Sequence, residues 1–324
     1  MLEGKTVLVT GGTGSIGFEL VKEVLRRGAE KVVIFSRDEI KHFILRKKLG
    51  DPRVVTVVGD VREKESIEKI FRRYRIDIVY HTAAMKHVVI CEDFPLEAVK
   101  TNILGTHNVV EACLDHGVPR MITISTDKAV HPVNVMGATK FIAERITLNA
   151  QKAAGKDQVF ACVRFGNVAN SRGSVIPVFV QNLKDRKPLE ITDRNVTRFI
   201  MRIKDAVKLI VKATGIAKGG EIFILKMKAF RLGDLVDVMV NKIAPLLSVE
   251  NVEVKEVGLS PGEKLHEELV NSIERGKAVE KEDMYVVMPD GEGAKEISYT
   301  SKDVDFLFPE ELEEIVKEYI KEGG

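Results

Sequence analysis

Tryptophan is absent from this 324-residue chain, and cysteine and glutamine each occur only three times. The cysteines are odd in number and widely spaced, without a CxxC or Cys/His ligand pattern, which argues against a disulfide framework and a metal site. We therefore predict no metal and interpret the cysteines as reduced packing residues. Scarce glutamine beside abundant Lys, Arg and Glu is typical of thermophilic proteins. The cysteines are Cys91, Cys113 and Cys162.

Long apolar runs and charge of a single sign are also lacking. No run approaches the roughly 18 residues of a membrane-spanning helix, and a strand-like segment begins almost at once without signal-peptide anatomy. The formal net charge is +2, with both signs interspersed. We therefore expect a cytoplasmic protein with neither nucleic acid nor a membrane as partner, while a small anionic substrate remains compatible with this charge.

Apolar, β-branched runs alternate with amphipathic stretches along the first half of the chain. Such near-continuous runs indicate buried parallel strands, and residues 18–27 and 96–114 have the spacing of helices. This alternation predicts an α/β fold, a Rossmann-type doubly wound parallel sheet. The predicted strands are residues 6–9, 31–35, 54–58, 76–80, 121–124 and 159–163.

The alternation breaks near residue 165 and gives way to irregular segments. We predict an NADP-binding Rossmann domain over residues 1–165. Residues 166–324 then form mainly a smaller C-terminal substrate-binding lobe, with some return of the chain to the first domain.

A glycine-rich turn follows the first predicted strand and precedes a helix. Glycines allow a tight turn there, let the backbone approach a pyrophosphate and let the helix pack near the strand. A glycine triplet in this βαβ context predicts dinucleotide binding rather than a purely structural turn. The candidate cofactor-binding residues are Gly11, Gly14, Ser15, Ile16 and Gly17.

The end of the second predicted strand bears on the choice of dinucleotide. Ser36 and Arg37, with Lys41 nearby, form a cationic, hydroxyl-bearing group that suits a 2′-phosphate and hence NADP. Asp38 keeps NAD open as the alternative. Four further residues after the third and fourth strands are expected along the cofactor: Asp60, Val61, Ala83 and Ala84.

Four polar residues, Ser125 to Lys128, end the fifth predicted strand. An adjacent acid and amine, Asp127 and Lys128, can act as general acid and general base on neighbouring atoms of one substrate, as the elimination of water requires. Met136 and Lys140 follow one helical turn apart. This frame resembles the short-chain dehydrogenases, in which a tyrosine occupies the position of Met136.

The whole set of motifs resembles the extended short-chain dehydrogenase/reductase family. Within it, the chain is similar to the polysaccharide-biosynthesis branch of UDP-N-acetylglucosamine 4,6-dehydratases. The resemblance spans nearly the whole chain and is carried by residues 10–17, 35–39, 83–88, 100–102, 125–130, 134–140, 164–168, 171–177, 197–199 and 261–269.

The resemblance implies a lyase reaction on a UDP-sugar. A hydride leaves C4 for the nicotinamide, water is eliminated across C5 and C6, and the hydride returns to C6. Lys128 matches the base for the C5 proton and Asp127 the acid for the C6 hydroxyl. We expect the pKa of the amine to be lowered and that of the acid to be raised, because each group then suits its task.

The remaining roles are carried over position by position. Lys140 matches a ligand of the nicotinamide ribose, and Thr126 and Ser125 match hydroxyls that bond the C4 oxygen. Thr101 belongs to a cofactor motif. His81 and His87 are interpreted as packing or cofactor-border residues. The other matched ligands of cofactor or sugar nucleotide are Lys86, Asn167, Arg172, Arg198 and Glu263.

Met136 departs from the usual tyrosine. A thioether has no exchangeable proton, so the base for C4 oxidation is left open between Lys140 and Lys128, acting directly, through water or through Thr126. The alternative functions are a UDP-sugar 4-epimerase and a catalytically silent NADP-binding protein. The resemblance also implies a homodimer or homohexamer.

Overall fold

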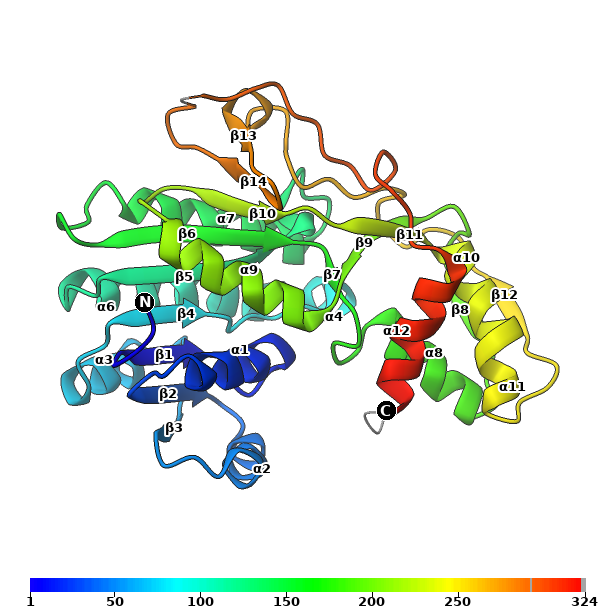
Figure 1. Ribbon diagram of the computed structural model, residues 1–324, viewed down its shortest axis with the longest axis horizontal. Coiled ribbons are helices and arrows are strands. Elements are labelled where there is room, and N and C mark those ends of the chain that lie inside the picture. The colour runs from blue at the N-terminus through cyan, green and yellow to red at the C-terminus, as the bar shows by residue number, and fades with distance from the viewer. Residues whose placement is uncertain (292, 322–324) are drawn as a thin grey trace.

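A nine-stranded sheet dominates the computed structural model, which describes residues 1–291 and 293–321 (Figure 1). All its strands from β10 to β3 are parallel, whereas β14 and β13 are added antiparallel at one edge. The α/β fold and parallel sheet expected from the sequence are confirmed. In spatial order the strands are β13 (Ala278–Glu280), β14 (Met284–Val287), β10 (Ile222–Leu225), β6 (Val159–Phe165), β5 (Arg120–Thr126), β4 (Ile78–His81), β1 (Thr6–Thr10), β2 (Lys31–Ser36) and β3 (Val54–Val58).

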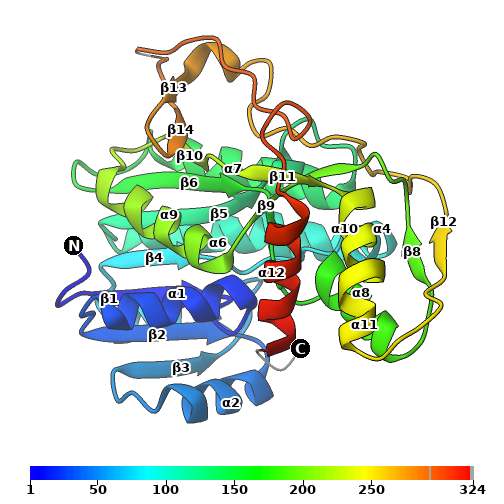
Figure 2. The ribbon, with the colours of Figure 1, turned by 45° about the vertical axis from the view of Figure 1, so that its right-hand side comes forward.

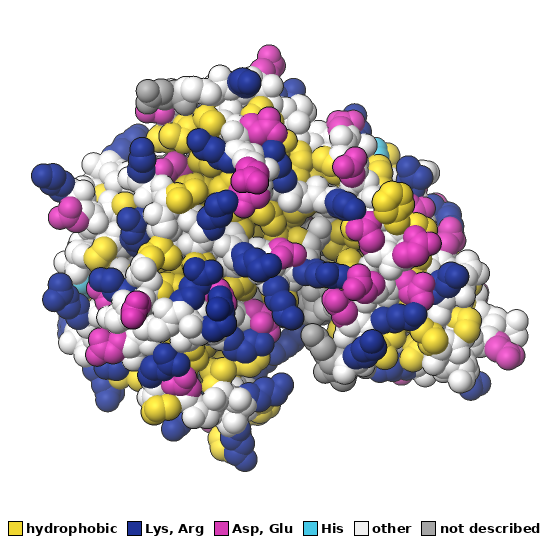
Figure 3. Space-filling view, in the orientation of Figure 1, with side chains coloured by type: hydrophobic (Ala, Val, Ile, Leu, Met, Phe, Trp, Pro, Cys, Tyr) yellow, Lys and Arg dark blue, Asp and Glu magenta, His cyan; other side chains and the backbone are white. Residues whose placement is uncertain are grey.

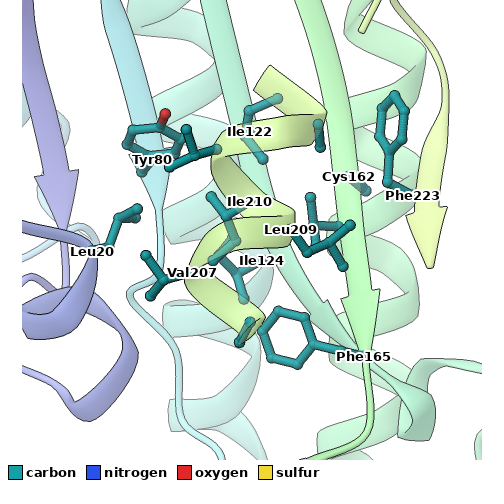
Figure 4. Packing of buried hydrophobic residues seen from close by; sticks show 14 of the residues in the cluster. Leu20, Tyr80, Ile122, Ile124, Cys162, Phe165, Val207, Leu209, Ile210 and Phe223 are labelled. Carbon is teal, nitrogen blue, oxygen red and sulfur yellow. The ribbon is translucent and has the colours of Figure 1, made fainter. Parts of the chain in front are cut away.

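Helices cover both faces of this sheet. On one face, α1 and α9 pack together, and the side chains of Val207, Leu209 and Ile210 on α9 lie over β5 and β6 (Figure 4). The other face carries α3, α6 and α7 in contact with one another. The bounds are α1 (Ser15–Arg26), α2 (Glu39–Leu49), α3 (Lys64–Arg73), α6 (Gly105–Asp115), α7 (Val135–Ala150) and α9 (Ile203–Ile216).

Two expectations about this region need correction. The run 54–58 does not form a fully buried strand, because β3 lies at the sheet edge and Val58 is 57% exposed. The predicted helix 96–114 is present as one uninterrupted helical stretch, but it is not a regular α-helix throughout. It divides into α5 (Pro95–Ala98), a π-helical turn η1 (Val99–Leu104) and α6, following the short helix α4 (Val88–Asp93). The π-helical turn places Thr101 and Asn102 in buried positions beside the site.

A smaller body lies beside the carboxyl ends of the strands and has its own apolar core (Figure 2). Two small sheets and four α-helices build it, with a π-helical turn η3 (Met239–Ile243). The sheets contain β7 (Asn167–Val168), β9 (Thr197–Met201) and β11 (Lys228–Arg231), and β8 (Leu189–Ile191) and β12 (Val254–Glu256). The helices are α8 (Val175–Lys184), α10 (Leu232–Val238), α11 (Ala244–Leu246) and α12 (Pro309–Lys321).

Between these segments the chain returns to the large sheet. Strands β10, β13 and β14 join that sheet, and α9 packs on one of its faces. The division into a cofactor-binding domain and a substrate-binding lobe stays a prediction. In the part of the chain that the structure covers, no helix combines the length and apolar character needed to cross a membrane. Acidic and basic side chains are mixed on the face in Figure 3. Among the surface ion pairs are Arg202–Glu314 and Lys212–Asp283.

Candidate active site

A cavity of about 690 Å³ opens along the carboxyl ends of the parallel strands. This edge of a doubly wound sheet is where such folds bind ligands, because loops from neighbouring strands converge there. Most of the cofactor and catalytic residues predicted from the sequence line it. They come from the glycine turn, the ends of β2 and β5, the segments after β3 and β4, η1, α7 and the segment 165–175.

The glycine turn at one end of the cavity permits close backbone packing. A Cβ on Gly17 would lie 2.5 Å from the Gly11 carbonyl oxygen, and one on Gly11, which has φ +67°, would lie 2.7 Å from the Ala83 nitrogen. Helix α1 starts at Ser15, and no acidic residue occupies its first turn. This arrangement suits the phosphates of a dinucleotide, which the positive end of a helix stabilises.

The end of β2 presents the cations Arg37 and Lys41 to the cavity, whereas the carboxylate of Asp38 is already engaged by contacts within the protein. Asp38 caps α2 by accepting from the Lys41 backbone N–H at 3.0 Å, and its other oxygen lies 2.7 Å from the Lys41 amine. These contacts with Lys41 hold the pKa of Asp38 below its ordinary value. The Arg37 side chain is 56% exposed and lies 3.7 Å from Asp60. The Ser36 hydroxyl bonds Thr13 and His42.

Asn102, in the π-helical turn η1, links three parts of the site wall. Its amide accepts from Met85 N–H, donates to the Met85 carbonyl and donates to the Thr139 hydroxyl on α7. The neighbouring Thr101 hydroxyl and the Ser125 hydroxyl are buried without a hydrogen-bond partner. Both residues line the cavity, so each retains the capacity to bond a polar ligand.

Asp127 and Lys128 lie at the carboxyl end of β5, in the 3₁₀ turn η2 (Asp127–Ala129). The Thr126 hydroxyl donates to Asp127 Oδ1 at 2.7 Å, and the Lys128 amine lies 3.2 Å from the same oxygen. Asp127 is fully buried, and its Oδ2 has no partner. A buried carboxylate oxygen without a partner is costly unless a ligand satisfies it.

Glu267 is a residue that the sequence did not single out. Its Oε1 lies 3.3 Å from the Lys128 amine, its Oε2 is buried without a partner, and the residue is only 2% exposed. It lies inside the run 261–269 that carries the family resemblance, and that membership is the only signal that could have identified it. No spacing rule connects it with Lys128.

The protonation expected for Lys128 needs correction. Burial alone would lower the pKa of its amine, but the carboxylates of Asp127 and Glu267 outweigh that effect and raise the pKa above its ordinary value. The resting site therefore holds Lys128 as a charged ammonium rather than as the neutral amine expected from the sequence.

Met136 and Lys140 occupy the first turns of α7, which Asn134 caps by accepting from Gly137 N–H. Met136 is 4% exposed and belongs to a small apolar cluster with Cys91 and Ala98. The Lys140 amine donates to the Ile124 carbonyl at 2.5 Å. Burial lowers the pKa of Lys140, and the Glu144 carboxylate only partly opposes this.

Of the predicted sugar-side residues, Lys86, Ser125, Asn167 and Arg172 line the cavity. The Lys86 amine donates to the Arg172 carbonyl at 2.6 Å, and burial, then the Arg172 charge, lowers the pKa of Lys86. The Arg172 N–H contacts the Ser15 hydroxyl at 3.3 Å, so the segment 171–174 lies against the glycine turn.

Arg198 and Glu263 are placed differently, because neither lines this cavity. The Arg198 guanidinium donates to Glu263 at 2.7 Å and to the carbonyls of Thr197 and Leu265, and it lies 3.9 Å from Glu267. The structure thus joins Arg198 to the Lys128 group through Glu267.

The two histidines beside the site have different environments. His81 is buried and bonds the hydroxyls of Thr10 and Thr106, and burial lowers its pKa to about 3. His87 lines the cavity beside Gly173, and burial, then the Lys86 charge, lowers its pKa. Both are therefore held neutral near pH 7.

Residues 7–289 match the family described as "Polysaccharide biosynthesis protein". An uncharacterized membrane protein of Methanocaldococcus jannaschii is 47% identical over 97% of this chain and 96% of its own length. A UDP-N-acetylglucosamine 4,6-dehydratase (inverting) of Campylobacter jejuni is 40% identical over 94% and 87%. A UDP-glucose 4-epimerase of Rickettsia rickettsii is 36% identical over 99% and 98%.

Solved structures agree with this relationship. Pen from Bacillus thuringiensis superposes with a TM-score of 0.92 at 39% identity, covering 98% of both chains. The dTDP-glucose 4,6-dehydratase DesIV from Streptomyces venezuelae, solved with NAD and TYD bound, gives a TM-score of 0.75 at 19% identity over 98% of this chain and 97% of its own. The chain therefore belongs to the polysaccharide-biosynthesis branch of the extended short-chain dehydrogenase/reductase family, which contains nucleotide-sugar dehydratases and epimerases.

Proposed function

We propose that this protein is an NADP-dependent UDP-N-acetylglucosamine 4,6-dehydratase. The observation that carries the proposal is the buried Asp127–Lys128 pair at the end of β5, which places an acid and an amine 3.2 Å apart. Elimination needs such a pair because one group removes the C5 proton while the other protonates the leaving C6 oxygen. Oδ2 of Asp127 has no hydrogen-bond partner, but Asp127 does not line the cavity, so its carboxyl would have to reach that oxygen from behind Thr126.

The proton of the C4 hydroxyl must also find an acceptor, because Met136 offers none. Thr126 already donates to Asp127 Oδ1 at 2.7 Å, so its hydroxyl can accept the C4 proton while passing its own to the carboxylate. Asp127 then carries the proton that the C6 oxygen needs when its bond to carbon breaks. The C4 hydroxyl proton thereby becomes part of the departing water through Thr126 and Asp127, while Lys128 takes the C5 proton.

Lys140 supports this reaction by position and charge. Its amine is buried and tied to the Ile124 carbonyl beside Ser125, so it lies at the strand end that faces the cavity. Among the open candidates for the oxidation base, we assign Lys140 to orienting the cofactor ribose and leave the C4 proton to Thr126.

Bound NADP would supply the acceptor and donor of the hydride. The glycine turn and Ser15 would hold its phosphates, Ala83, Ala84 and Thr101 would border it, and Asp60 and Val61 would lie by the adenine. Ser36, Arg37 and Lys41 support NADP over NAD, since Asp38, the acid that could bind a ribose hydroxyl, is occupied by α2 and Lys41.

The Campylobacter jejuni relative supports UDP-N-acetylglucosamine as substrate. Lys86, Ser125 and Asn167 would contact the sugar or its phosphates from the cavity wall, and Arg172 would do so from the segment over the glycine turn. Arg198 and Glu263 do not line the cavity, so they would act indirectly, through the contact of Arg198 with Glu267 beside Lys128. A cytoplasmic location and a homodimer or homohexamer complete the proposal.

A UDP-sugar 4-epimerase is the second candidate, because the Rickettsia rickettsii relative has that activity in its name. Epimerisation returns the hydride to C4 and needs no acid and base for elimination. The Asp127–Lys128 pair would then have no chemical task, which favours the dehydratase.

Liquid chromatography with mass spectrometry of UDP-sugars, UDP-N-acetylglucosamine among them, each incubated with the purified protein without added cofactor, tests the proposal. A product lighter by one water is expected, because a hydride that is borrowed and returned leaves the cofactor unchanged. A new sugar of unchanged mass would establish the epimerase instead. No change in any UDP-sugar, also after NADP is supplied, would support the catalytically silent protein.

A further inference from the structure

We propose that Glu267 is a positioning residue that holds the Lys128 ammonium in place and controls when Lys128 gives up its proton. This inference rests on the proposed dehydratase function and deepens it. It concerns a residue of the segment between β12 and β13 that acts on a base at the end of β5.

Glu267 contacts Lys128 from the interior of the protein and does not line the cavity. Its Oε1 lies 3.3 Å from the Lys128 amine, and Asp127 Oδ1 lies 3.2 Å from that amine. The Lys128 side chain is 21% exposed, whereas the Glu267 side chain is 3% exposed. Glu267 therefore reaches the substrate's reacting atoms only through the amine that it contacts.

The position of Glu267 is itself fixed by its backbone. Its N–H donates to the Ser301 hydroxyl, and its carbonyl accepts from Ser301 N–H at 2.8 Å. Ser301 also contacts the Thr197 hydroxyl on β9. A carboxylate on so constrained a backbone can hold a flexible lysine in one orientation, which reduces the entropy lost when the amine meets C5.

The charges around Lys128 set the direction of the effect. In the described part of the chain, three charged groups face the amine: Asp127 from its own turn, Glu267 from the segment after β12, and Arg198 from β9. The two carboxylates favour the ammonium and Arg198 opposes it, while Glu263 pairs with Arg198. Loss of the Glu267 charge leaves Arg198 facing Lys128 with less compensation, so the ammonium should deprotonate at lower pH.

The proposed step balances. Lys128 must first release a proton to solvent, so that Asp127 stays free to receive the C4 proton through Thr126. The neutral amine then takes the C5 proton, a bond from nitrogen to hydrogen forms, and the electrons of the C–H bond expel the C6 oxygen as Asp127 protonates it. Glu267 sets the fraction of the enzyme in which Lys128 is already the neutral amine.

The experiment is the pH dependence of C5 hydrogen exchange. The 4-keto-6-deoxy product is incubated in deuterium oxide with the parent or with Glu267→Gln, and the loss of the C5 proton signal is followed by NMR. This readout isolates the Lys128 step from hydride transfer. We expect the pH at which exchange reaches half its maximum to fall by roughly one to three units in Glu267→Gln.

Two further variants separate this role from a structural one. Glu267→Asp keeps the charge, so its pH midpoint should stay close to that of the parent even where its maximal rate falls. Glu268→Gln alters the exposed neighbour that contacts His131 and should change neither rate nor midpoint. If Glu267→Gln does not fold, Glu267→Asp provides the test. A pH midpoint that differs from the parental value by roughly one unit or more would then overturn the proposal, because this variant retains the charge.

An unchanged midpoint in folded, active Glu267→Gln would also overturn the role of Glu267 while leaving the dehydratase function intact. Absence of exchange and of dehydration in the parent, by contrast, would refute the proposed function itself. The two failures are therefore distinguishable.

Discussion

Thr126 Oγ1, on the last residue of β5, lies 2.7 Å from Oδ1 of Asp127, the first residue of η2, and donates a hydrogen bond to it. The threonine lines the cavity, whereas the carboxylate is buried behind it. In the proposed reaction, this contact would supply the path for the C4 proton, which a tyrosine usually accepts in this fold.

Lys128→Ala and Asp127→Asn should each reduce the dehydration rate by about a hundredfold or more, the usual scale for a positioned acid or base. Product formation is followed by mass spectrometry, and cofactor fluorescence checks that binding survives. The exposed Lys156 provides a matched control, since Lys156→Ala should retain parental turnover. Near-normal turnover in either site variant would remove its proposed role.

Met136→Tyr should fold, at a cost of about 1–3 kcal/mol, because the added phenol must enter the apolar cluster with Cys91 and Ala98. Thermal unfolding measures this cost, with Met136→Leu as the size-matched control. Lys140→Ala should be the more damaging change for catalysis, since it removes the amine that we assign to the cofactor ribose. Single-turnover hydride transfer as fast as in the parent would contradict that assignment.

Much of this site could be predicted from local sequence. The glycine turn, the strand ends and the adjacent Asp127 and Lys128 are determined by nearby residues and by the rule that parallel strands end at one edge. Glu267 could not be predicted, because its contact with Lys128 joins positions far apart in the chain. The charged state of Lys128 was missed for the same reason, since Glu267 contributes to it.

The predicted helix 96–114 contains a π-helical turn for a different reason. Its apolar spacing suits an α-helix throughout, and the π-helical turn η1 appears where Asn102 bonds both Met85 and Thr139. Sequence periodicity cannot reveal such a turn, because π-helical turns depend on tertiary contacts and occur frequently at functional sites.

Arg37→Ala should weaken NADPH binding by about tenfold, equivalent to about 1.4 kcal/mol, and should change NADH binding much less. The reason is that the exposed guanidinium would meet only the extra phosphate. Fluorescence titration of both reduced cofactors measures the ratio, and the NADPH affinity should fall as salt is raised. Equal losses for NADPH and NADH would argue against the NADP assignment.

Glu274→Gln should destabilise the fold by about 2 kcal/mol or more, because it breaks a buried pair with Arg164. Burial alone would raise the pKa of Glu274, but Arg164 outweighs it and lowers the pKa below the ordinary 4.5. The stabilisation is therefore present above pH 4.5 and is lost as the pH falls through the lowered value.

Denaturant titrations of Glu274→Gln and the parent should accordingly converge in acid. Arg145→Ala is the control, because Arg145 contacts the Glu274 carboxylate at 3.5 Å from an exposed position and contributes little. A stability difference that stayed constant from neutral pH into acid would contradict the proposed charge on Glu274.

The most direct test of the dehydratase account is the reaction of UDP-N-acetylglucosamine in deuterium oxide, with the product examined by NMR. Lys128 exchanges its protons with solvent before C5 is reprotonated, so we predict a 4-keto-6-deoxy sugar nucleotide that carries deuterium at C5. A product with an unlabelled C5, or a C4 epimer that retains its C6 hydroxyl, would contradict elimination by Asp127 and Lys128.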